Sequence, residues 1–208
     1  METGLSENLE YQYQTSCAGH HHAYLLPILD RAIKEYQPAR IFDLGCGNGS
    51  TAHYISRYCD VVGVDPAESA VRIASQAFPG LRIDIGSAYD DLVAKYDTFP
   101  MVISLEVVEH LYSPRKFARS LFELLEPGGI AVVSTPYHGY FKNLALAVTG
   151  RMDRHFTALW DGGHIKFWSI ATLSKLLIEA ELEIVRTERV GRIPALAKSM
   201  VMIARRPQ

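Results

Sequence analysis

The sequence predicts an α/β protein built on a mostly parallel sheet with helices on both faces. Three observations support this fold class. Strand-like and helix-like segments alternate along residues 40–134. The strand-like runs are almost continuously apolar and rich in Val and Ile, which is typical of strands buried on both faces. The first of these runs leads directly into a glycine-rich turn, Asp43–Ser50, that opens a helix.

The elements follow from periodicity and from breaker residues. Apolar residues at helical spacing from Tyr24 to Ile33 predict a first helix that ends before Pro38. Strands are then expected at Arg40–Leu44, Asp60–Asp65, Leu81–Ile85, Pro100–Leu105 and Ile130–Ser134, with helices at Ser50–Tyr58, Glu68–Ala77 and Pro114–Leu125. The stretch 137–163 gives no clean signal of helix or strand. A helix at Ile170–Ala180 and strand-like runs at Leu182–Val190 and Met200–Ala204 complete the pattern.

Composition indicates one globular domain and excludes several functional classes. The chain has 208 residues, of which 48% are hydrophobic, enough for a full core. Its net charge of −2 gives no overall attraction to nucleic acid or anionic lipid. The three cysteines, Cys17, Cys46 and Cys59, are odd in number and lack metal-knuckle spacing, which favours a reducing compartment. With a polar, acidic start and no apolar run of about 20 residues, we expect a cytoplasmic protein.

The glycine turn indicates which ligand the chain binds. Gly45, Gly47 and Gly49 carry no Cβ, so a ligand can approach their backbone closely, although such a turn can also exist without a ligand. Asp65 ends the next strand about 20 residues on, where an acidic side chain typically takes ribose hydroxyls. Asp43 would repel a pyrophosphate but can hold an ammonium group. These features favour S-adenosylmethionine over a dinucleotide.

Over residues 40–135 the chain resembles the class I S-adenosylmethionine-dependent methyltransferases. The matching segments are Asp43–Ser50, Gly63-Val64-Asp65, Ser87-Ala88, Met101–Leu105 and Leu125–Gly129. The resemblance implies a Rossmann-like fold whose seven-stranded sheet has an antiparallel last strand. It also implies a cofactor site formed by Asp43, Gly45 and Gly47 near the methionine part, Asp65 on the ribose, Ala88 near the adenine and Leu105 beneath the cofactor. S-adenosylhomocysteine would be the product.

A single domain, 1–208, is therefore expected to have four parts. These are an N-terminal helical cap (1–38), a cofactor-binding core (39–135), a substrate lid insert (136–169) and a C-terminal helix with two strands (170–208). In the cap, Tyr11 and Tyr13 are candidate lid residues. The aromatic insert contains an apolar run, 140–148, for which three roles stay open: weak peripheral membrane contact, packing onto the sheet, or a dimer interface. The oligomeric state is not predicted.

An acidic and histidine cluster follows the fourth predicted strand. Glu106, Glu109 and His110 have i, i+3, i+4 spacing and would share one face if a helix began at once. Two carboxylates and an imidazole suggest a divalent-metal site, with Mg²⁺ favoured by oxygen ligands and Mn²⁺ by imidazole. The segment resembles ubiquinone-biosynthesis (UbiG-type) O-methyltransferases, which carry Ser-x-Glu-x-x-Glu-His and use a divalent cation. Resemblance to small-RNA 3′-end 2′-O-methyltransferases adds His164 as a further ligand.

The expected function is O-methylation of a small, catechol-like or quinol-like acceptor, with Glu106, Glu109 and His110 as the catalytic residues. In the metal-free alternative, which many methyltransferases of this class exemplify, a Glu caps a helix and His110 is the general base. A second enzymatic alternative, methylation of an RNA 3′ end, predicts a basic groove that the near-neutral composition does not favour. The third alternative is a non-catalytic S-adenosylmethionine-binding domain, which would be expected to lack this cluster.

Overall fold

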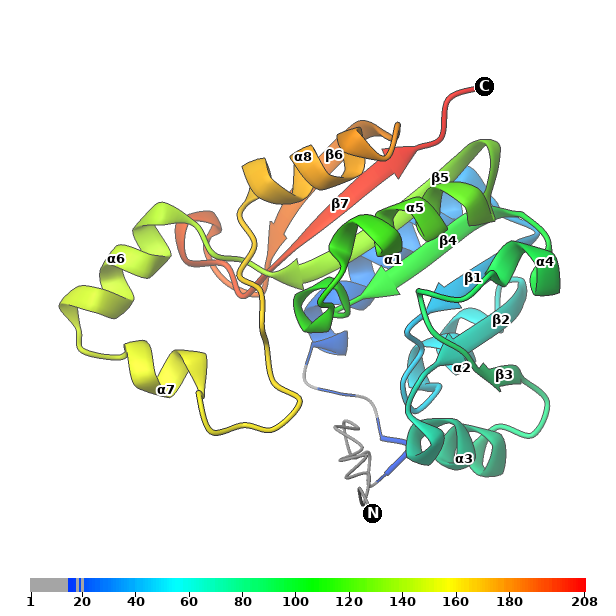
Figure 1. Cartoon of the computed structure of the whole chain (residues 1–208), viewed down its shortest axis with the longest axis horizontal. Coiled ribbons are helices and arrows are strands. Elements are labelled where there is room, and N and C mark those ends of the chain that lie inside the picture. Colours follow the sequence, from blue (N-terminus) through cyan, green and yellow to red (C-terminus); the bar gives the residue numbers. More distant parts are fainter. Residues whose placement is uncertain (1–14, 18, 20) are drawn as a thin grey trace, which may run out of the picture.

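The computed structural model describes residues 15–17, 19 and 21–208 and contains one seven-stranded sheet (Figure 1). The strands are β1 (Arg40–Leu44), β2 (Asp60–Asp65), β3 (Arg82–Ile85), β4 (Phe99–Leu105), β5 (Leu125–Pro136), β6 (Glu183–Val190) and β7 (Ser199–Arg205), in the spatial order β3-β2-β1-β4-β5-β7-β6. Strands β1 to β5 pair in parallel, whereas β7 is antiparallel to both β5 and β6. The predicted α/β class and the antiparallel last strand are confirmed.

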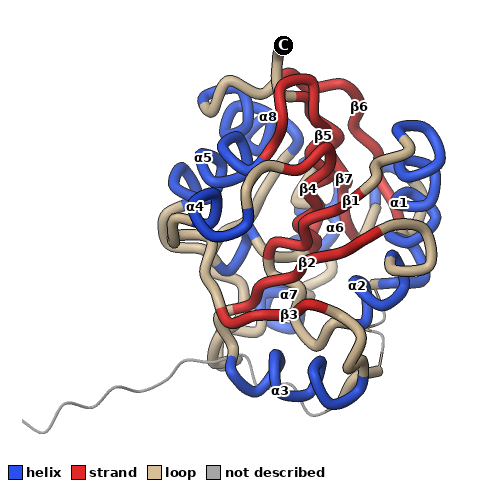
Figure 2. Tube along the Cα trace, turned by 90° about the vertical axis from the view of Figure 1, so that its right-hand side faces the viewer, coloured by secondary structure: helices blue, strands red, loops and turns tan. Residues whose placement is uncertain are grey.

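Helices cover both faces of this sheet. They are α1 (His22–Tyr36), α2 (Ser50–Ile55), α3 (Glu68–Ala77), α4 (Leu92–Tyr96), α5 (Pro114–Leu124), α6 (Tyr140–Val148), α7 (Met152–Phe156) and α8 (Ile170–Glu179), with short 3-10 turns at Val108–His110 and Pro194–Leu196. Figure 2 shows α1 and α2 on one side of the strands and α4, α5 and α8 on the other. Two separate clusters of buried apolar side chains fill these interfaces, one on each face of the sheet.

Some elements differ from the sequence prediction. Helix α4 was not predicted because it is a single turn of five residues, begun by the Asp91 carboxylate accepting a hydrogen bond from the Ala94 amide. Strand β5 starts five residues early because it includes the Gly128-Gly129 segment. The predicted lid residues Tyr11 and Tyr13 lie outside the described residues.

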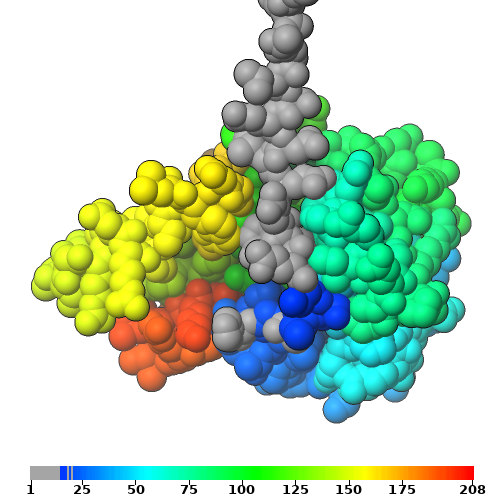
Figure 3. Space-filling model, turned by 90° about the horizontal axis from the view of Figure 1, so that it is seen from below, coloured from blue at the N-terminus to red at the C-terminus, as the bar shows by residue number. Residues whose placement is uncertain are grey.

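The segment between β5 and α8 forms a separate lobe. It leaves and rejoins the body at one isolated parallel bridge between Tyr137 and Trp168, where the His138 amide donates to the Trp168 carbonyl at 2.9 Å. Helices α6 and α7 lie beyond the carboxyl ends of the strands (Figure 1), and Figure 3 shows the segment, in yellow, projecting beside the rest of the molecule. In the described part of the chain, no helix combines the length and apolarity needed to cross a membrane.

Candidate active site

The glycine turn packs against the segment that follows β4. Gly45 (φ +85°) and Gly49 (φ +76°) adopt the left-handed conformation that favours glycine. The amides of Gly45 and Cys46 donate to the Val64 carbonyl at 2.9 and 3.0 Å, which fixes the turn beside β2. A Cβ on Gly45 would lie 2.5 Å from Cγ2 of Val107. The turn and the acidic segment around Val107 are therefore direct neighbours at the carboxyl edge of the sheet.

The Asp65 carboxylate organises this turn. Its Oδ2 accepts a hydrogen bond from the Gly47 amide at 2.8 Å, and its Oδ1 accepts one from the Ala67 amide at 2.9 Å. The side chain is buried at the end of β2, next to the end of β1. The predicted cofactor residues Gly47 and Asp65 are thus brought together, and the contact of Asp65 with a ribose stays a prediction.

Asp43 is a buried carboxyl with no counter-ion in the described part of the chain. It is 2% exposed, and its Oδ2 has no hydrogen-bond partner among the described residues. Burial, followed by the charge of Asp65, raises the pKa of Asp43 to about 8. An ionised carboxylate is costly in such a place unless a cation pairs with it. The position therefore fits the ammonium group of S-adenosylmethionine.

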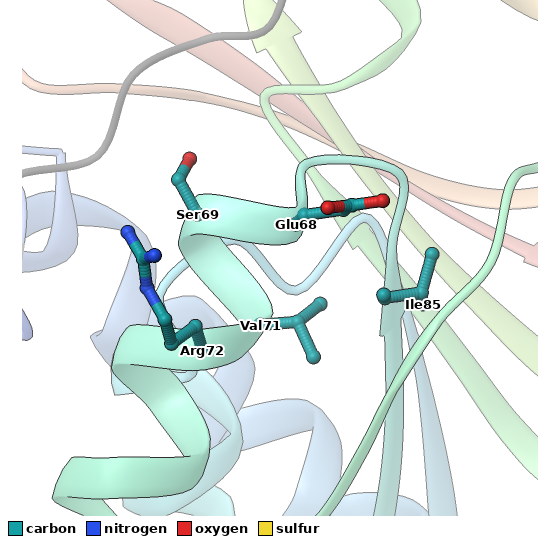
Figure 4. A pocket seen from close by; sticks show the side chains of 5 residues that line it. All are labelled: Glu68, Ser69, Val71, Arg72 and Ile85. Atoms are coloured by element: carbon teal, nitrogen blue, oxygen red, sulfur yellow. The ribbon is translucent and has the colours of Figure 1, made fainter.

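The other two predicted cofactor residues lie along the same edge. Ala88 is buried in the loop after β3, and Leu105 is the last, partly buried residue of β4. A hollow of about 410 Å³ opens between α3 and the end of β3, lined by Glu68, Ser69, Val71, Arg72 and Ile85 (Figure 4). It lies at this edge because Ile85 pairs with Asp65 across β3 and β2. Sequence reasoning did not find this lining, since its residues form no motif.

The expected helix does not begin directly after β4, so the predicted common face of Glu106, Glu109 and His110 is wrong. Glu106 has a left-handed backbone (φ +57°), and only a short 3-10 turn follows at Val108–His110. The Glu106 carboxyl turns toward β5 and β7, where it accepts hydrogen bonds from Ser134 at 2.8 Å and Ser199 at 3.2 Å. Burial raises the pKa of Glu106 to about 7.

Three potential metal ligands nevertheless converge. One ligand atom from each of Glu109, His110 and His164 lies within 4.8 Å of the others, and Glu106 is not part of this group. Nε2 of His164 is 3.9 Å from Oε1 of Glu109. The loop that carries His164 is held there because the amides of Ile165 and Lys166 both donate to the Glu109 carbonyl at 3.0 Å.

Glu109 is buried in a manner that suits a bound cation. Its Oε2 accepts a hydrogen bond from Thr135 at 2.9 Å, whereas its Oε1 is buried and has no hydrogen-bond partner within the described ranges. Burial, and then the charge of Glu106, raises the pKa of Glu109 well above its usual value. Thr135 and Ser134, which hold the two carboxyls, were missed from the sequence, although the adjacency of β4 and β5 could have indicated them.

The histidines are in the form that a metal requires. Nδ1 of His110 lies 3.0 and 3.2 Å from the carbonyls of Gly162 and Gly163, so it donates its proton and the lone pair is on Nε2. Burial lowers the pKa of His110, and that of His164 to about 4, which keeps both rings neutral at pH 7. The donor set of one carboxylate and two neutral imidazoles therefore fits a divalent cation.

Comparison with known proteins identifies the fold family. A family model described as a methyltransferase domain matches residues 14–187. This chain belongs to the methyltransferase-domain family. Ubiquinone biosynthesis O-methyltransferase from Azorhizobium caulinodans is 36% identical over 125 residues, covering 58% of this chain and 49% of the relative. The enzyme of the same name from Dinoroseobacter shibae is 35% identical over 156 residues, covering 71% and 61%.

The chain spans about half to three fifths of the length of these curated relatives. Among solved structures, an S-adenosylmethionine-dependent methyltransferase from Mesorhizobium loti superimposes with a TM-score of 0.65 at 20% identity, covering 85% of this chain and 96% of that one. The likeness confirms the Rossmann-like class I methyltransferase fold. Membership of the family implies S-adenosylmethionine as the cofactor of this methyltransferase domain.

Proposed function

We propose that this domain transfers a methyl group from S-adenosylmethionine to an oxygen of a small catechol-like or quinol-like acceptor with the help of a divalent metal. The observation that carries the proposal is the convergence of Glu109, His110 and His164 within 4.8 Å beside the glycine turn. The ubiquinone biosynthesis O-methyltransferases, to which the chain is similar, support an oxygen acceptor.

In the proposed reaction the acceptor oxygen attacks the sulfonium methyl in line, the C–S bond breaks, and S-adenosylhomocysteine leaves as a neutral thioether. The protein must hold the two reactants in line and remove the hydroxyl proton. Asp43 would hold the donor's ammonium group. Because Nδ1 of His110 is engaged by carbonyls, its Nε2 lone pair would serve the metal when one is bound, and the hydroxyl proton would then leave to solvent; without a metal the same Nε2 is the candidate general base. Mg²⁺ or Mn²⁺ held by Glu109, His110 and His164 would lower the pKa of the acceptor hydroxyl.

Glu106 has a different role in this proposal. Its carboxyl is held by Ser134 and Ser199 and its charge acts on Glu109, so it sets the electrostatics of the site from beside the metal ligands. We therefore expect Glu106→Ala to lower turnover while the affinity for metal falls less than in a Glu109 variant.

The metal assignment is tested with Glu109→Gln and His164→Ala. Both should weaken Mn²⁺ binding, followed by calorimetry, by at least about tenfold, and should abolish turnover on a catechol panel. Affinity for S-adenosylhomocysteine should stay within a few-fold. Glu179→Gln, a change at a partly exposed carboxylate on α8, is the matched control. Full activity in EDTA would reject the metal and leave His110 as a metal-free base.

We further propose that α6 makes weak peripheral contact with a lipid surface. Tyr140, Phe141 and Val148 are 76%, 67% and 79% exposed, so packing onto the sheet does not account for them. Arg151 and Arg154 follow in the same lobe and are exposed, with the exposed Asp153 between them. Apolar side chains flanked by basic ones favour an anionic membrane surface. Pairing with a second copy of the chain is the competing outcome.

A further inference from the structure

A second pocket lies entirely within the lobe 137–168. Its volume is about 450 Å³, within the range of roughly 300–1,000 Å³ usual for small-molecule sites. The lining comprises His138, Asn143, Phe156, Ala158, His164 and Phe167. Because His164 also belongs to the candidate metal cluster, a molecule that fills this pocket has one end at the proposed site of methyl transfer.

The walls of the pocket are aromatic. The rings of Phe156 and Phe167 meet edge to face, with centroids 4.8 Å apart. His138 continues the wall, stacked on Phe156 at 6.0 Å and edge-on to Phe167 at 5.0 Å. Flat, rigid walls of this kind favour a planar ring over a compact polar molecule. The pocket therefore suits the ring of an aromatic acceptor.

Two polar atoms of the lining residues lack a hydrogen-bond partner among the described residues, Nδ1 of His138 and Oδ1 of Asn143. His138 is 8% exposed, and its Nδ1 makes no hydrogen bond with any described residue. Burial, and then the positive charge of Lys142, lowers the pKa of His138 to about 4, so the ring is neutral at pH 7. A neutral imidazole can donate one hydrogen bond, and a buried donor left unpaired is costly. A ligand group with an acceptor oxygen would satisfy it.

The electrostatic surroundings indicate the charge of that group. The lining contains no acidic side chain. The charge of Lys142 is felt by both His138 and His155, and that of Arg192 is felt by His155 and Lys142. The Lys142 side chain is itself buried, and burial lowers the pKa of its amine to about 8, so most of it is charged at pH 7. The amine donates to the Tyr137 carbonyl at 2.7 Å, which holds it in position. A fixed positive field around an unpaired donor favours an anionic oxygen.

We propose that this pocket selects aromatic acceptors that carry a carboxylate on the ring, with His138 donating a hydrogen bond to the carboxylate while the reacting hydroxyl faces His164. The inference rests on the proposed function for the position of the hydroxyl. It makes His138 a specificity-determining residue, separate from the proposed metal ligands.

The test compares 3,4-dihydroxybenzoate, catechol, 3,4-dihydroxybenzylamine and 4-butylcatechol. Binding to the full chain, saturated with S-adenosylhomocysteine and Mn²⁺, is measured by calorimetry. We expect the benzoate to bind at least about tenfold more tightly than catechol and the benzylamine more weakly. His138→Phe keeps the aromatic wall and should reduce the benzoate-to-catechol affinity ratio about tenfold. His155→Phe, a neighbouring histidine outside the lining, should leave the ratio unchanged.

Equal ratios in the wild type and His138→Phe would overturn the proposal, as would tighter binding of the benzylamine or of 4-butylcatechol. If His138→Phe does not fold, the ligand order on the unaltered protein decides. The proposed function fails separately: a benzoate that binds in a His138-dependent manner but is never methylated refutes the methyl transfer and retains the pocket. Methylation of catechol with no preference for the benzoate would support the proposed methyl transfer and refute the carboxylate-selecting pocket.

Discussion

The buried carboxyl of Asp43 affects the stability of the fold and, in the proposed function, also the binding of the ligand's ammonium group. Its raised pKa contributes stability that is fully present below the ordinary value of 3.8 and is lost as the pH rises through about 8. At neutral pH the empty site therefore favours a protonated carboxyl, whereas a bound ammonium would favour the ionised form. If Asp43 holds the ammonium group of the ligand, as proposed, it does so at the expense of the stability of the unliganded fold.

Asp43→Asn should separate these two effects. As the pH rises from 5 to 8, the free energy of unfolding should fall in both proteins. The fall should be smaller in the variant by at least about 2 kcal/mol, because an amide does not ionise. Its affinity for S-adenosylhomocysteine should fall by about tenfold or more, because the ammonium loses its partner. Urea unfolding and calorimetry measure the two quantities. Asp60→Asn, at the exposed start of β2, is the control, and unchanged affinity in Asp43→Asn would refute the assignment.

Some single residues could be placed from the sequence and others could not. Gly45, Gly47 and Asp65 were predicted to lie together, and they do, because a parallel sheet brings successive strand ends to one edge. The turn of Glu106 away from Glu109 could not be predicted, because it depends on a left-handed backbone at a residue other than glycine. Ser199, which holds Glu106, comes from a distant strand and gives no local signal.

At the scale of elements, α6 and α7 are the helices of the lobe that bury no apolar side chain. Helix α6 is the longer of the two. Lys142 is its only buried residue. This lack of burial is also why no periodic signal predicted the helix, since a helix that buries no apolar stripe has no pattern of 3.6 residues to detect. Helices α3 and α5 were predictable because they place apolar faces on the sheet.

If α6 meets a lipid surface, Phe141→Ser with Val148→Ser should reduce binding to anionic vesicles about tenfold, because two large apolar groups no longer insert. Co-sedimentation with vesicles that contain about 30% phosphatidylserine measures the effect. The matched control is Ile178→Ser with Val185→Ser, exposed apolar residues outside the lobe. A wild-type protein that does not pellet with lipid but dimerises in a manner abolished by the α6 change would assign this face to a second copy.

At the scale of the whole molecule, buried histidines in separate parts of the fold make its stability depend on pH. Burial lowers the pKa of His22, His138 and His164 to about 4 in each case. His22 joins α1 to α2 through a 2.9 Å hydrogen bond with Thr51, whereas the other two lie in the lobe. A lowered histidine pKa contributes stability that is present above the ordinary value of 6.5 and is lost as the pH falls toward about 4.

Acidification from pH 7 to pH 5 relieves the buried carboxyls Asp43, Glu106 and Glu109, whose pKa values are raised, and so adds stability. Each of these partly buried histidines should oppose that gain by about 1 kcal/mol, and their summed contribution is the pH dependence to be measured. His22→Gln should remove about a third of that pH dependence while retaining a hydrogen-bonding side chain for Thr51. Denaturant titrations at half-unit pH steps give the slope directly. A pH dependence of stability in His22→Gln equal to that of the wild type would show that His22 is not held neutral.

The bridge between Tyr137 and Trp168 has a consequence for how this protein can change. The segment it closes leaves and returns at one point, and it supplies every residue that lines the pocket, whereas the glycine turn, Asp43 and Asp65 belong to the sheet. A segment with adjoining ends can be exchanged with little disturbance to the body that holds it. If this pocket holds the acceptor, as proposed, its choice is largely separable from the donor site. Transplanting residues 138–167 from a homologue that keeps a histidine at the position of His164 should redirect substrate preference while the glycine turn, Asp43 and Asp65 stay unchanged.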